Sequence, residues 1–209
     1  MGLSKVWVFG EATDGKVATI TLEMLAKARE LSDNVEVVYG GADADAVAGT
    51  LGEHGAKAVL ATGDLGGGLQ GTAVAAAIAA AIAAGNGPAA ILFGTTYDGR
   101  DVAGRLSAKI DAPVITHVVD LEVNGDKLVG TEPVFGGTTN VKTTFTSDKT
   151  QIVLVRPKSF GAEGVGGGAA AVSSLEVPDL GATGAAKVKS RFVEEATGLR
   201  QGGDGEPVP

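Results

Sequence analysis

The sequence predicts an α/β protein with a Rossmann-like, doubly wound, mostly parallel sheet and an antiparallel hairpin extension at one edge. Two observations predict this fold class. Short, continuously apolar runs alternate with helical patterns over residues 5–110, which is typical of parallel strands covered by helices on both faces. The pair Asn124–Gly125 then separates two strand-like runs, and Asn-Gly is the strongest short signal for a hairpin.

The parallel part is predicted from apolar periodicity and from the glycines that interrupt it. The expected strands are Lys5–Phe9, Val35–Tyr39, Lys57–Ala61 and Ala90–Phe93. The expected helices are residues 17–31, a short helix after a cap at Asp43 or Asp45 and before Gly55, Thr72–Ala84, and a helix that opens at Asp98 and reaches Ile110. Asp98 is the expected N-cap of this last helix, because a carboxylate can accept from the free amides of the first turn.

The pattern changes after Pro113. We expect one long strand over Val114–Val123, the hairpin turn, a return over residues 127–131, an alternating strand over Val141–Thr146 and a buried strand over Gln151–Val155. The α/β domain is therefore expected to span residues 1–157. Residues 158–209 are expected to be a Gly/Ala-rich linker without a core of their own, with Gly161–Ala171 flexible.

The end of the chain gives weaker signals. Leu175–Leu180 fits a short extended segment, Lys187–Val193 shows weak strand alternation, and Gln201–Pro209 is polar and rich in Gly and Pro. The last of these is expected to be disordered.

Composition excludes several classes of function. The 209 residues carry a net charge of −8, which argues against nucleic acid or an anionic membrane as partner, since phosphate binding needs a basic patch. There is no cysteine, so thiolate chemistry and disulfides are excluded. The longest apolar run, Ala73–Ala84, is shorter than the roughly 20 residues of a membrane span. With no visible leader, we expect a cytoplasmic protein without membrane insertion.

No catalytic or metal centre is predicted. His54 precedes Gly55 at a helix end, where an imidazole can bond free carbonyls, and His117 is expected to be a core or edge histidine. Neither has a serine or carboxylate placed beside it in a catalytic pattern. An enzymatic role is therefore not expected.

Two arginines and one phenylalanine are candidate partner or interdomain contacts. Arg100 lies near the start of its helix, where a cation opposes the helix dipole, so it either pairs with Asp98 or Asp101 or serves a partner; Arg105 is one turn further along. Phe135, before Gly136–Gly137, marks either a sheet corner or a close approach by a partner.

The stretch Gly66–Gly71 matches G-x-G-x-x-G between a strand and a helix. The acidic residue expected about twenty positions later is replaced by an apolar strand, and no lysine follows Gly71. A flexible strand-to-helix turn and a nucleotide loop both remain open.

The segments Ile91–Thr96 and Gly99–Ile110 resemble the alpha subunit of electron transfer flavoproteins, in which an apolar strand and a Gly-Thr turn precede Gly-Arg-Asp-Leu-Ala-x-Arg-Leu-Ala. The opening strand, Phe135–Gly137 and Gln151–Pro157 agree with this resemblance. Ala186–Glu195 is similar to the family's link into its second domain.

The resemblance implies a soluble carrier that pairs with a beta subunit and uses one FAD. It implies electron transfer from flavin-dependent dehydrogenases, such as acyl-CoA dehydrogenases, to a quinone reductase-type acceptor. The family's FAD-binding loops belong to a C-terminal domain that is absent here, so no FAD-contacting residue is assigned and FAD binding is expected to be weak or absent. This chain would be the scaffold and heterodimerisation part. The alternatives are a stand-alone adenine-nucleotide-binding protein and a purely structural module.

Overall fold

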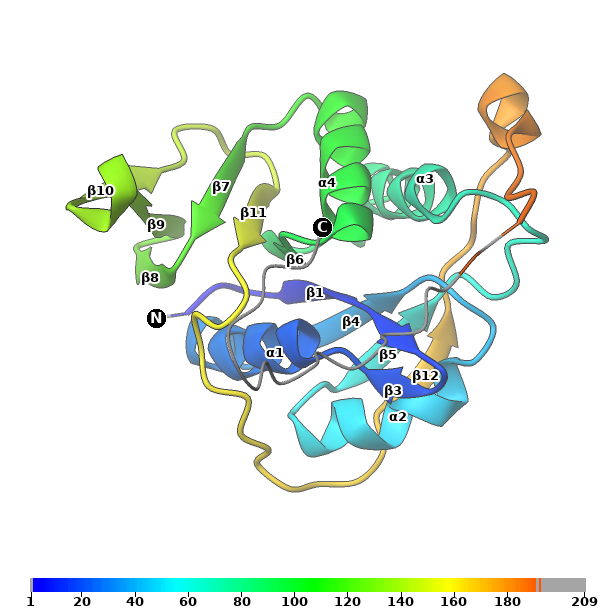
Figure 1. Cartoon of the computed structure of the whole chain (residues 1–209), viewed down its shortest axis with the longest axis horizontal. Coiled ribbons are helices and arrows are strands. Elements are labelled where there is room, and N and C mark those ends of the chain that lie inside the picture. Colours follow the sequence, from blue (N-terminus) through cyan, green and yellow to red (C-terminus); the bar gives the residue numbers. More distant parts are fainter. Residues whose placement is uncertain (1, 191, 193–209) are drawn as a thin grey trace, which may run out of the picture.

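The computed structural model describes residues 2–190 and 192, and its centre is one parallel sheet. The strand order is β12-β5-β4-β1-β6-β11-β7, and every pairing between these strands is parallel. The strands are β1 (Val6–Gly10), β4 (Val35–Tyr39), β5 (Ala58–Ala61), β6 (Ala90–Gly94), β7 (Val114–Val118), β11 (Gln151–Val155) and β12 (Ala171–Ser174). The predicted Rossmann-like fold class is confirmed (Figure 1).

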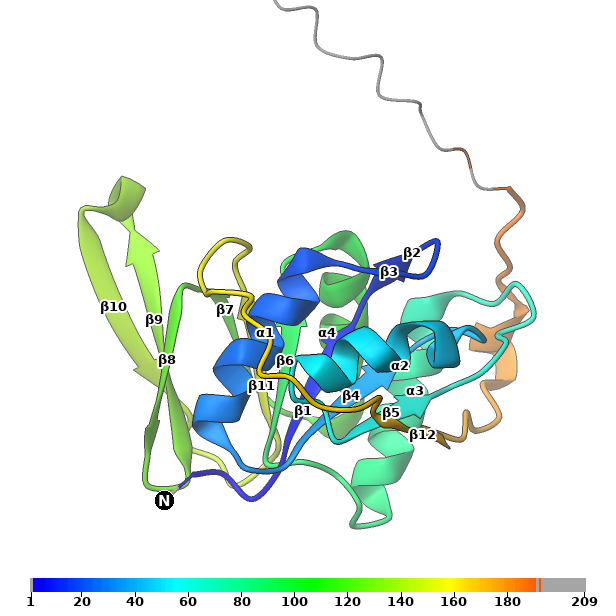
Figure 2. The same ribbon diagram turned by 90° about the horizontal axis from the view of Figure 1, so that it is seen from below.

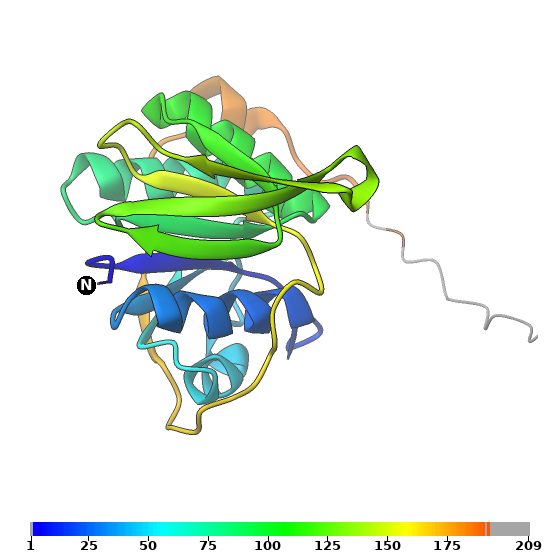
Figure 3. The same ribbon diagram turned by 90° about the vertical axis from the view of Figure 1, so that its left-hand side faces the viewer.

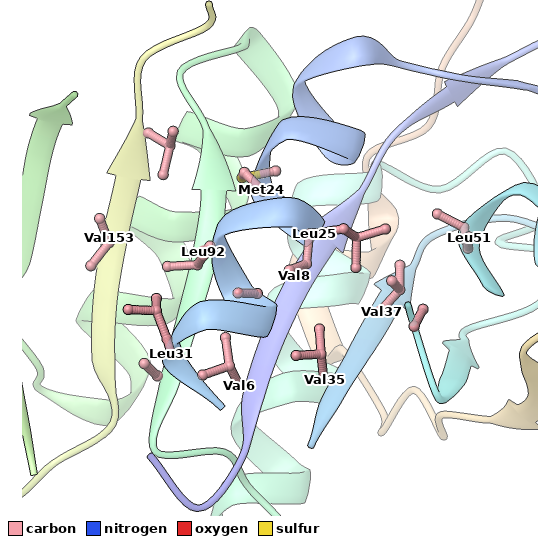
Figure 4. Packing of buried hydrophobic residues seen from close by; sticks show 14 of the residues in the cluster. Val6, Val8, Met24, Leu25, Leu31, Val35, Val37, Leu51, Leu92 and Val153 are labelled. Carbon is pink, nitrogen blue, oxygen red and sulfur yellow. The ribbon is translucent and has the colours of Figure 1, made fainter. Parts of the chain in front are cut away.

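Helices cover both faces of this sheet. They are α1 (Thr19–Leu31), α2 (Ala44–Glu53), α3 (Gln70–Ala83) and α4 (Tyr97–Ile110). Side chains alternate along a strand, so Val6 and Val8 of β1 pack with α1 and α2, whereas Trp7 and Phe9 pack with α3 and α4. Figure 4 shows the first of these two cores, with Met24, Leu25 and Leu31 of α1 pointing at the sheet. Both cores are built from continuously buried strands, as the apolar runs predicted.

The start of α1 differs from the prediction by two residues. Lys16–Val17 is a short strand, β3, that pairs with β2 (Ala12–Thr13). Asp14 and Gly15 make the turn between them with positive φ of 51° and 73°, a conformation that Asp and Gly tolerate best. The helix therefore begins only at Thr19.

The predicted cap of α4 is wrong. The N-cap is Thr96, whose hydroxyl accepts from the amide of Gly99 at 2.9 Å, and Asp98 lies in the first turn. A hydroxyl and a carboxylate are comparable caps, so local preference did not decide between them. Strand β6 ends at Gly94, which leaves Thr96 as the residue at the point where the helix starts.

The single long strand expected over Val114–Val123 is also wrong. The chain turns sharply near His117, whose φ is +56°, and continues as β8 (Asp120–Asn124) in a second sheet. This second sheet contains β8, β9 (Lys127–Val134) and β10 (Thr139–Thr144), all antiparallel. The turn at Asn124–Gly125 is confirmed, and a one-turn 3₁₀ helix, η1 (Phe135–Gly137), joins β9 to β10.

The chain after β11 contributes a further strand to the parallel sheet. It crosses the face formed by α1 and α2 and adds β12 beside β5, at the opposite edge of the sheet from β7 (Figures 1 and 3). The amides of Val165 and Ala170 donate to the carbonyls of Glu53 and Ala48 in α2, at 2.9 and 3.0 Å. The regular element of this region is thus β12, several residues before the expected extended segment at Leu175–Leu180.

The rest of the described chain lies over α3. A 3₁₀ helix, η2 (Gly181–Ala185), follows β12, and Lys187 then forms an isolated antiparallel bridge with Gly68. Among the described residues of Lys187–Val193, the weak strand pattern is seen as this bridge. Arg191, Val193 and Gln201–Pro209 lie outside the described residues. The boundary placed at residue 157 stays a prediction. No helix in the described part is both long and apolar enough to cross a membrane.

Candidate functional site: the carboxyl edge of the sheet and the projecting hairpin

The order in which the chain adds strands to the parallel sheet reverses between β1 and β6. From β1 the chain adds β4 and β5 on one side, whereas β6 starts the half that contains β11 and β7. In open α/β sheets, ligands bind at the carboxyl ends of the strands at such a switch point. Glu11 follows β1 and Thr96 follows β6, and the Thr96 hydroxyl donates to Glu11 Oε1 at 2.8 Å. The carboxyl edge at this position is therefore the first place to test for a ligand site.

A polar cavity of about 360 Å³ opens at this edge. Its charged lining residues are Glu11, Asp43 and Asp98, all acidic. Burial raises the pKa of Glu11 above its usual 4.5; the bond from Thr96 opposes that shift, and Asp98 adds to it. The Tyr39 hydroxyl donates to Asp43 at 3.0 Å, and burial followed by this bond raises the pKa of Tyr39 to about 12. Every charged side chain of this lining is thus acidic, and no basic residue of the described chain lines it.

This lining does not fit a nucleotide or a flavin pyrophosphate. Phosphate sites need donors and positive charge, and the next cavity along the edge adds Asp64 and Asp101. A Cβ on Gly71 would lie 1.8 Å from Asp101 Oδ2, so a carboxylate already fills the space beside the first turn of α3. The Gly66–Gly71 match is therefore best described as a strand-to-helix turn, in which Gly66 and Gly67 have positive φ.

Arg105 and Arg100 have different surroundings. Arg105 Nε bonds Asp101 Oδ1 at 2.8 Å, one helical turn away. Arg100 is exposed and forms no ion pair within the described residues; its Nε donates to the Thr96 carbonyl at 3.1 Å, and its guanidinium lies over the Tyr97 ring at 5.3 Å from the centroid. The pairing of Arg100 with Asp98 or Asp101 is therefore not found, and Arg100 stays a candidate contact.

The sequence reasoning missed Tyr97. Its side chain is 88% exposed, which is unusual for a large aromatic residue, and it forms one surface with Arg100. Tyr and Arg are enriched among residues that dominate binding energy at interfaces. The sequence signal was an aromatic residue directly after a Gly-Thr-Thr turn, at the carboxyl end of a buried strand.

Phe135 lies at the tip of the β9–β10 hairpin. It is 83% exposed and has a φ of +51°. The hairpin projects past the body of the domain at the end where the central strands finish (Figure 2). No hydrogen bond, ion pair or cation–π contact found among the described residues joins Phe135 to Arg100 or Arg105, so these bonds do not link the three candidates into one cluster.

The two histidines behave as expected. His54 Nδ1 lies 2.7 Å from the Thr50 carbonyl at the end of α2, and His117 is exposed on β7, which is an edge strand of the parallel sheet. No group of three or more potential metal ligands is found in residues 2–190 and 192.

Comparison with known proteins decides the family. A family model described as "Electron transfer flavoprotein domain" matches residues 6–180. The chain belongs to the electron transfer flavoprotein family. It is 32% identical over 178 residues to an electron transfer flavoprotein subunit alpha of Mycobacterium tuberculosis, covering 84% of this chain and 54% of that relative. The alpha subunit of Mycobacterium leprae is 31% identical, covering 97% of this chain and 65% of the relative.

A third electron transfer flavoprotein alpha subunit, from Syntrophomonas wolfei, is 30% identical over 65% of this chain and 43% of that relative. The chain thus spans about half the length of the curated relatives it matches. The resemblance read from residues 91–110 is confirmed. The adenine-nucleotide alternative is not favoured, since the family is shown and the carboxyl-edge cavity is acidic.

Proposed function

We propose that this chain is the part of an electron transfer flavoprotein alpha subunit that assembles with a beta subunit. In this proposal the whole protein is a cytoplasmic, non-enzymatic carrier that passes electrons from flavin dehydrogenases, such as acyl-CoA dehydrogenases, to a quinone reductase-type acceptor. FAD is held mainly outside the described residues, in keeping with the acidic lining of the carboxyl-edge cavity. The observation that carries the assembly proposal is the open edge of β10.

The turn of the β8–β9 hairpin determines which residues of each strand direct their backbone N–H and C=O groups toward the neighbouring strand. Asn124 and Lys127 pair across a two-residue loop, so they exchange both bonds, and bonded and non-bonded pairs alternate from there. Residues 130, 132 and 134 of β9 therefore face β10. Their partners are Thr143, Val141 and Thr139. The other three residues of β10, at 140, 142 and 144, direct their amides and carbonyls away from the sheet.

The position of Pro133 is consistent with this alternation of bonded and non-bonded pairs. Its ring nitrogen cannot donate, and the alternation places it on the β8 side of β9, beyond the end of β8 at Asp120. All ladder positions between β9 and β10 keep their donors. The hairpin is therefore complete without using the outer edge of β10.

This outer edge lacks the usual protection of sheet edges. Proteins block exposed edges with proline, bulges, short strands or charged side chains, but β10 has six residues in continuous register and no proline. Its one charge, Lys142, reaches back across the sheet, where Nζ bonds both oxygens of Glu122 at 3.0 and 2.9 Å. An extended strand from another chain can add to such an edge through main-chain hydrogen bonds.

The beta subunit is the preferred source of that strand. If two copies of this chain paired through all three outward residues of β10, Lys142 would lie opposite Lys142, and like charges directly opposite are destabilising. The described chain leaves the parallel sheet after β12 and then contacts the turn at Gly67, whereas β10 lies at the other side of the molecule (Figure 1). A separate subunit with an acidic residue opposite Lys142 satisfies both observations.

The test replaces one outward amide. Lys142→Pro removes an N–H that has no partner in the hairpin, and Lys142→Ala is the matched control that removes the charge but keeps the amide. We expect Lys142→Pro to weaken binding of the same organism's beta subunit at least ten-fold relative to Lys142→Ala, measured by calorimetry, with the two melting temperatures alike. Equal affinities would exclude the β10 edge. No binding by the unmodified chain would overturn the assembly proposal itself.

The cofactor part has a separate test. After incubation with FAD and gel filtration, the chain alone should elute without flavin absorbance. Retained flavin in stoichiometric amount would contradict the proposed location of the cofactor.

A further inference from the structure

Phe135, at the tip of the β9–β10 hairpin, combines an exposed ring with an unfavourable backbone conformation. Its side chain is 83% exposed and its φ is +51°. Five residues other than glycine have positive φ in the described part of the chain, and Phe135 is the only apolar one among them. The left-handed region is costly for a residue with a Cβ, because that atom approaches the following carbonyl oxygen. For a bulky residue such a φ is an outlier.

The turn around Phe135 holds it in this conformation. Gly136 and Gly137 follow with φ of 70° and 90°, and the Thr138 hydroxyl donates to the Phe135 carbonyl at 3.0 Å. A glycine at position 135 could adopt the same φ without the steric cost. The stability of the hairpin would therefore favour a glycine at its tip over a phenylalanine.

The ring of Phe135 is not packed against the rest of the chain. It belongs to neither hydrophobic core, and it takes part in no aromatic pair or cation–π contact found among the described residues. Neither the backbone nor the ring of this residue thus stabilises the isolated chain. Strained residues cluster at functional sites, where the surrounding structure holds them in place. The tip is therefore a candidate binding element.

Two valines beside the tip share one face of the hairpin. Val134 of β9 is diagonal to Val141 of β10, since its direct partner in the ladder lies two residues before Val141. Paired residues share a face of the sheet, and so do residues two apart along a strand. Val141 is 42% exposed. Lys142, the next residue of β10, lies on the opposite face, so this face of β10 presents an apolar side chain beside the tip.

We propose that Phe135 is an aromatic anchor of the beta-subunit interface, and that its ring enters an apolar pocket of the beta subunit. The inference rests on the assembly proposed above, because the outward residues of β10 begin at Asn140, shortly after Phe135 in the chain. A strand added to that edge extends the face that carries Val141, so the partner that supplies the strand lies beside the tip as well. Aromatic residues are enriched at the centres of interfaces. The added strand should be apolar on the side of Val141 and acidic on the side of Lys142.

The test separates the ring from the backbone conformation. Phe135→Ala removes the ring but keeps a Cβ at positive φ, whereas Phe135→Gly removes both. In the isolated 209-residue chain we expect Phe135→Gly to melt about 2–4 °C above Phe135→Ala, because glycine relieves the conformation. Both variants should bind the same organism's beta subunit at least about ten-fold more weakly than the parent chain in calorimetry. Phe135→Tyr, which keeps an aromatic ring, should bind within about three-fold of the parent chain.

Val165→Ala is the matched control. It removes another exposed apolar side chain, from the segment that crosses α2, and should leave the affinity for the beta subunit unchanged. Because Phe135→Gly is expected to be stable, weaker binding by this variant cannot be attributed to unfolding.

The outcomes distinguish the anchor from the assembly. Unchanged affinity in Phe135→Ala and Phe135→Gly, while the parent chain binds, would overturn the anchor and leave the assembly proposal standing. An equal loss in Val165→Ala would overturn the anchor too, because the effect would not depend on the hairpin. If Phe135→Gly melts below Phe135→Ala, the strained tip on which the inference depends is contradicted. If the parent chain does not bind the beta subunit, the assembly proposal and the anchor fail together.

Discussion

Gly52 of α2 supports the chain that crosses the outer face of α1 and α2. A Cβ at this position would lie 2.1 Å from the Gly168 carbonyl oxygen and 2.5 Å from the Ala170 amide nitrogen. Both are backbone atoms, so the collision is relieved only if the crossing segment moves. Gly52→Ala should therefore displace residues 165–170 from α2.

The loss of unfolding free energy in Gly52→Ala can be estimated from the backbone hydrogen bonds that the substitution would break. Two backbone hydrogen bonds tie the crossing segment to α2, from Val165 to Glu53 and from Ala170 to Ala48, and each contributes about 0.5–1.5 kcal/mol. The alanine itself favours the helix by up to about 1 kcal/mol. We expect a net loss of about 1–2 kcal/mol, which corresponds to a fall in melting temperature of about 2–8 °C for a domain of this size.

Gly49 offers a matched control in the same helix, because a Cβ there would meet nothing within 4 Å. Gly49→Ala should raise stability by up to about 1 kcal/mol from helix propensity alone. The assay is thermal and urea unfolding of the two variants beside the parent chain. If Gly52→Ala is as stable as Gly49→Ala, the crossing segment is not seated on α2 and the reasoning is refuted.

Two further predictions concern the carboxyl edge. Burial raises the pKa of Glu11 above its usual 4.5. Between these two pKa values the folded chain binds more protons than the unfolded chain, so the free energy of unfolding falls as pH rises. Glu11→Gln should lack this decline, and parallel pH profiles of urea unfolding for Glu11→Gln and the parent chain would contradict the assignment. Arg100→Ala removes a hydrogen bond to the Thr96 carbonyl and the cation–π contact with Tyr97. The melting temperature should therefore change by no more than it does in Arg105→Ala, while the affinity for the beta subunit falls. A large loss of melting temperature in Arg100→Ala would show a structural role instead.

The family was recognisable from local sequence because its signals are local. The strand Ile91–Phe93, the Gly-Thr turn and the helix after it occupy twenty consecutive residues, and the structure keeps them as β6, a turn and α4. Apolar runs buried on both faces, and helices with one apolar stripe, are also properties of short segments. The alternation of strands and helices thus predicted the layers of the fold and their parallel sheet.

The sequence by itself determined the fold class, the hairpin turn and the family. Tertiary structure decided what depends on distant residues meeting. The chain after β11 crosses two helices and pairs with β5, and the glycine at position 52 permits the close approach of the two backbones. No local pattern in the sequence indicates such a contact. The meeting of Glu11 with Thr96, 85 positions apart, and the open edge of β10 likewise follow from which strands lie side by side, since a strand's own sequence does not state whether a neighbour is present.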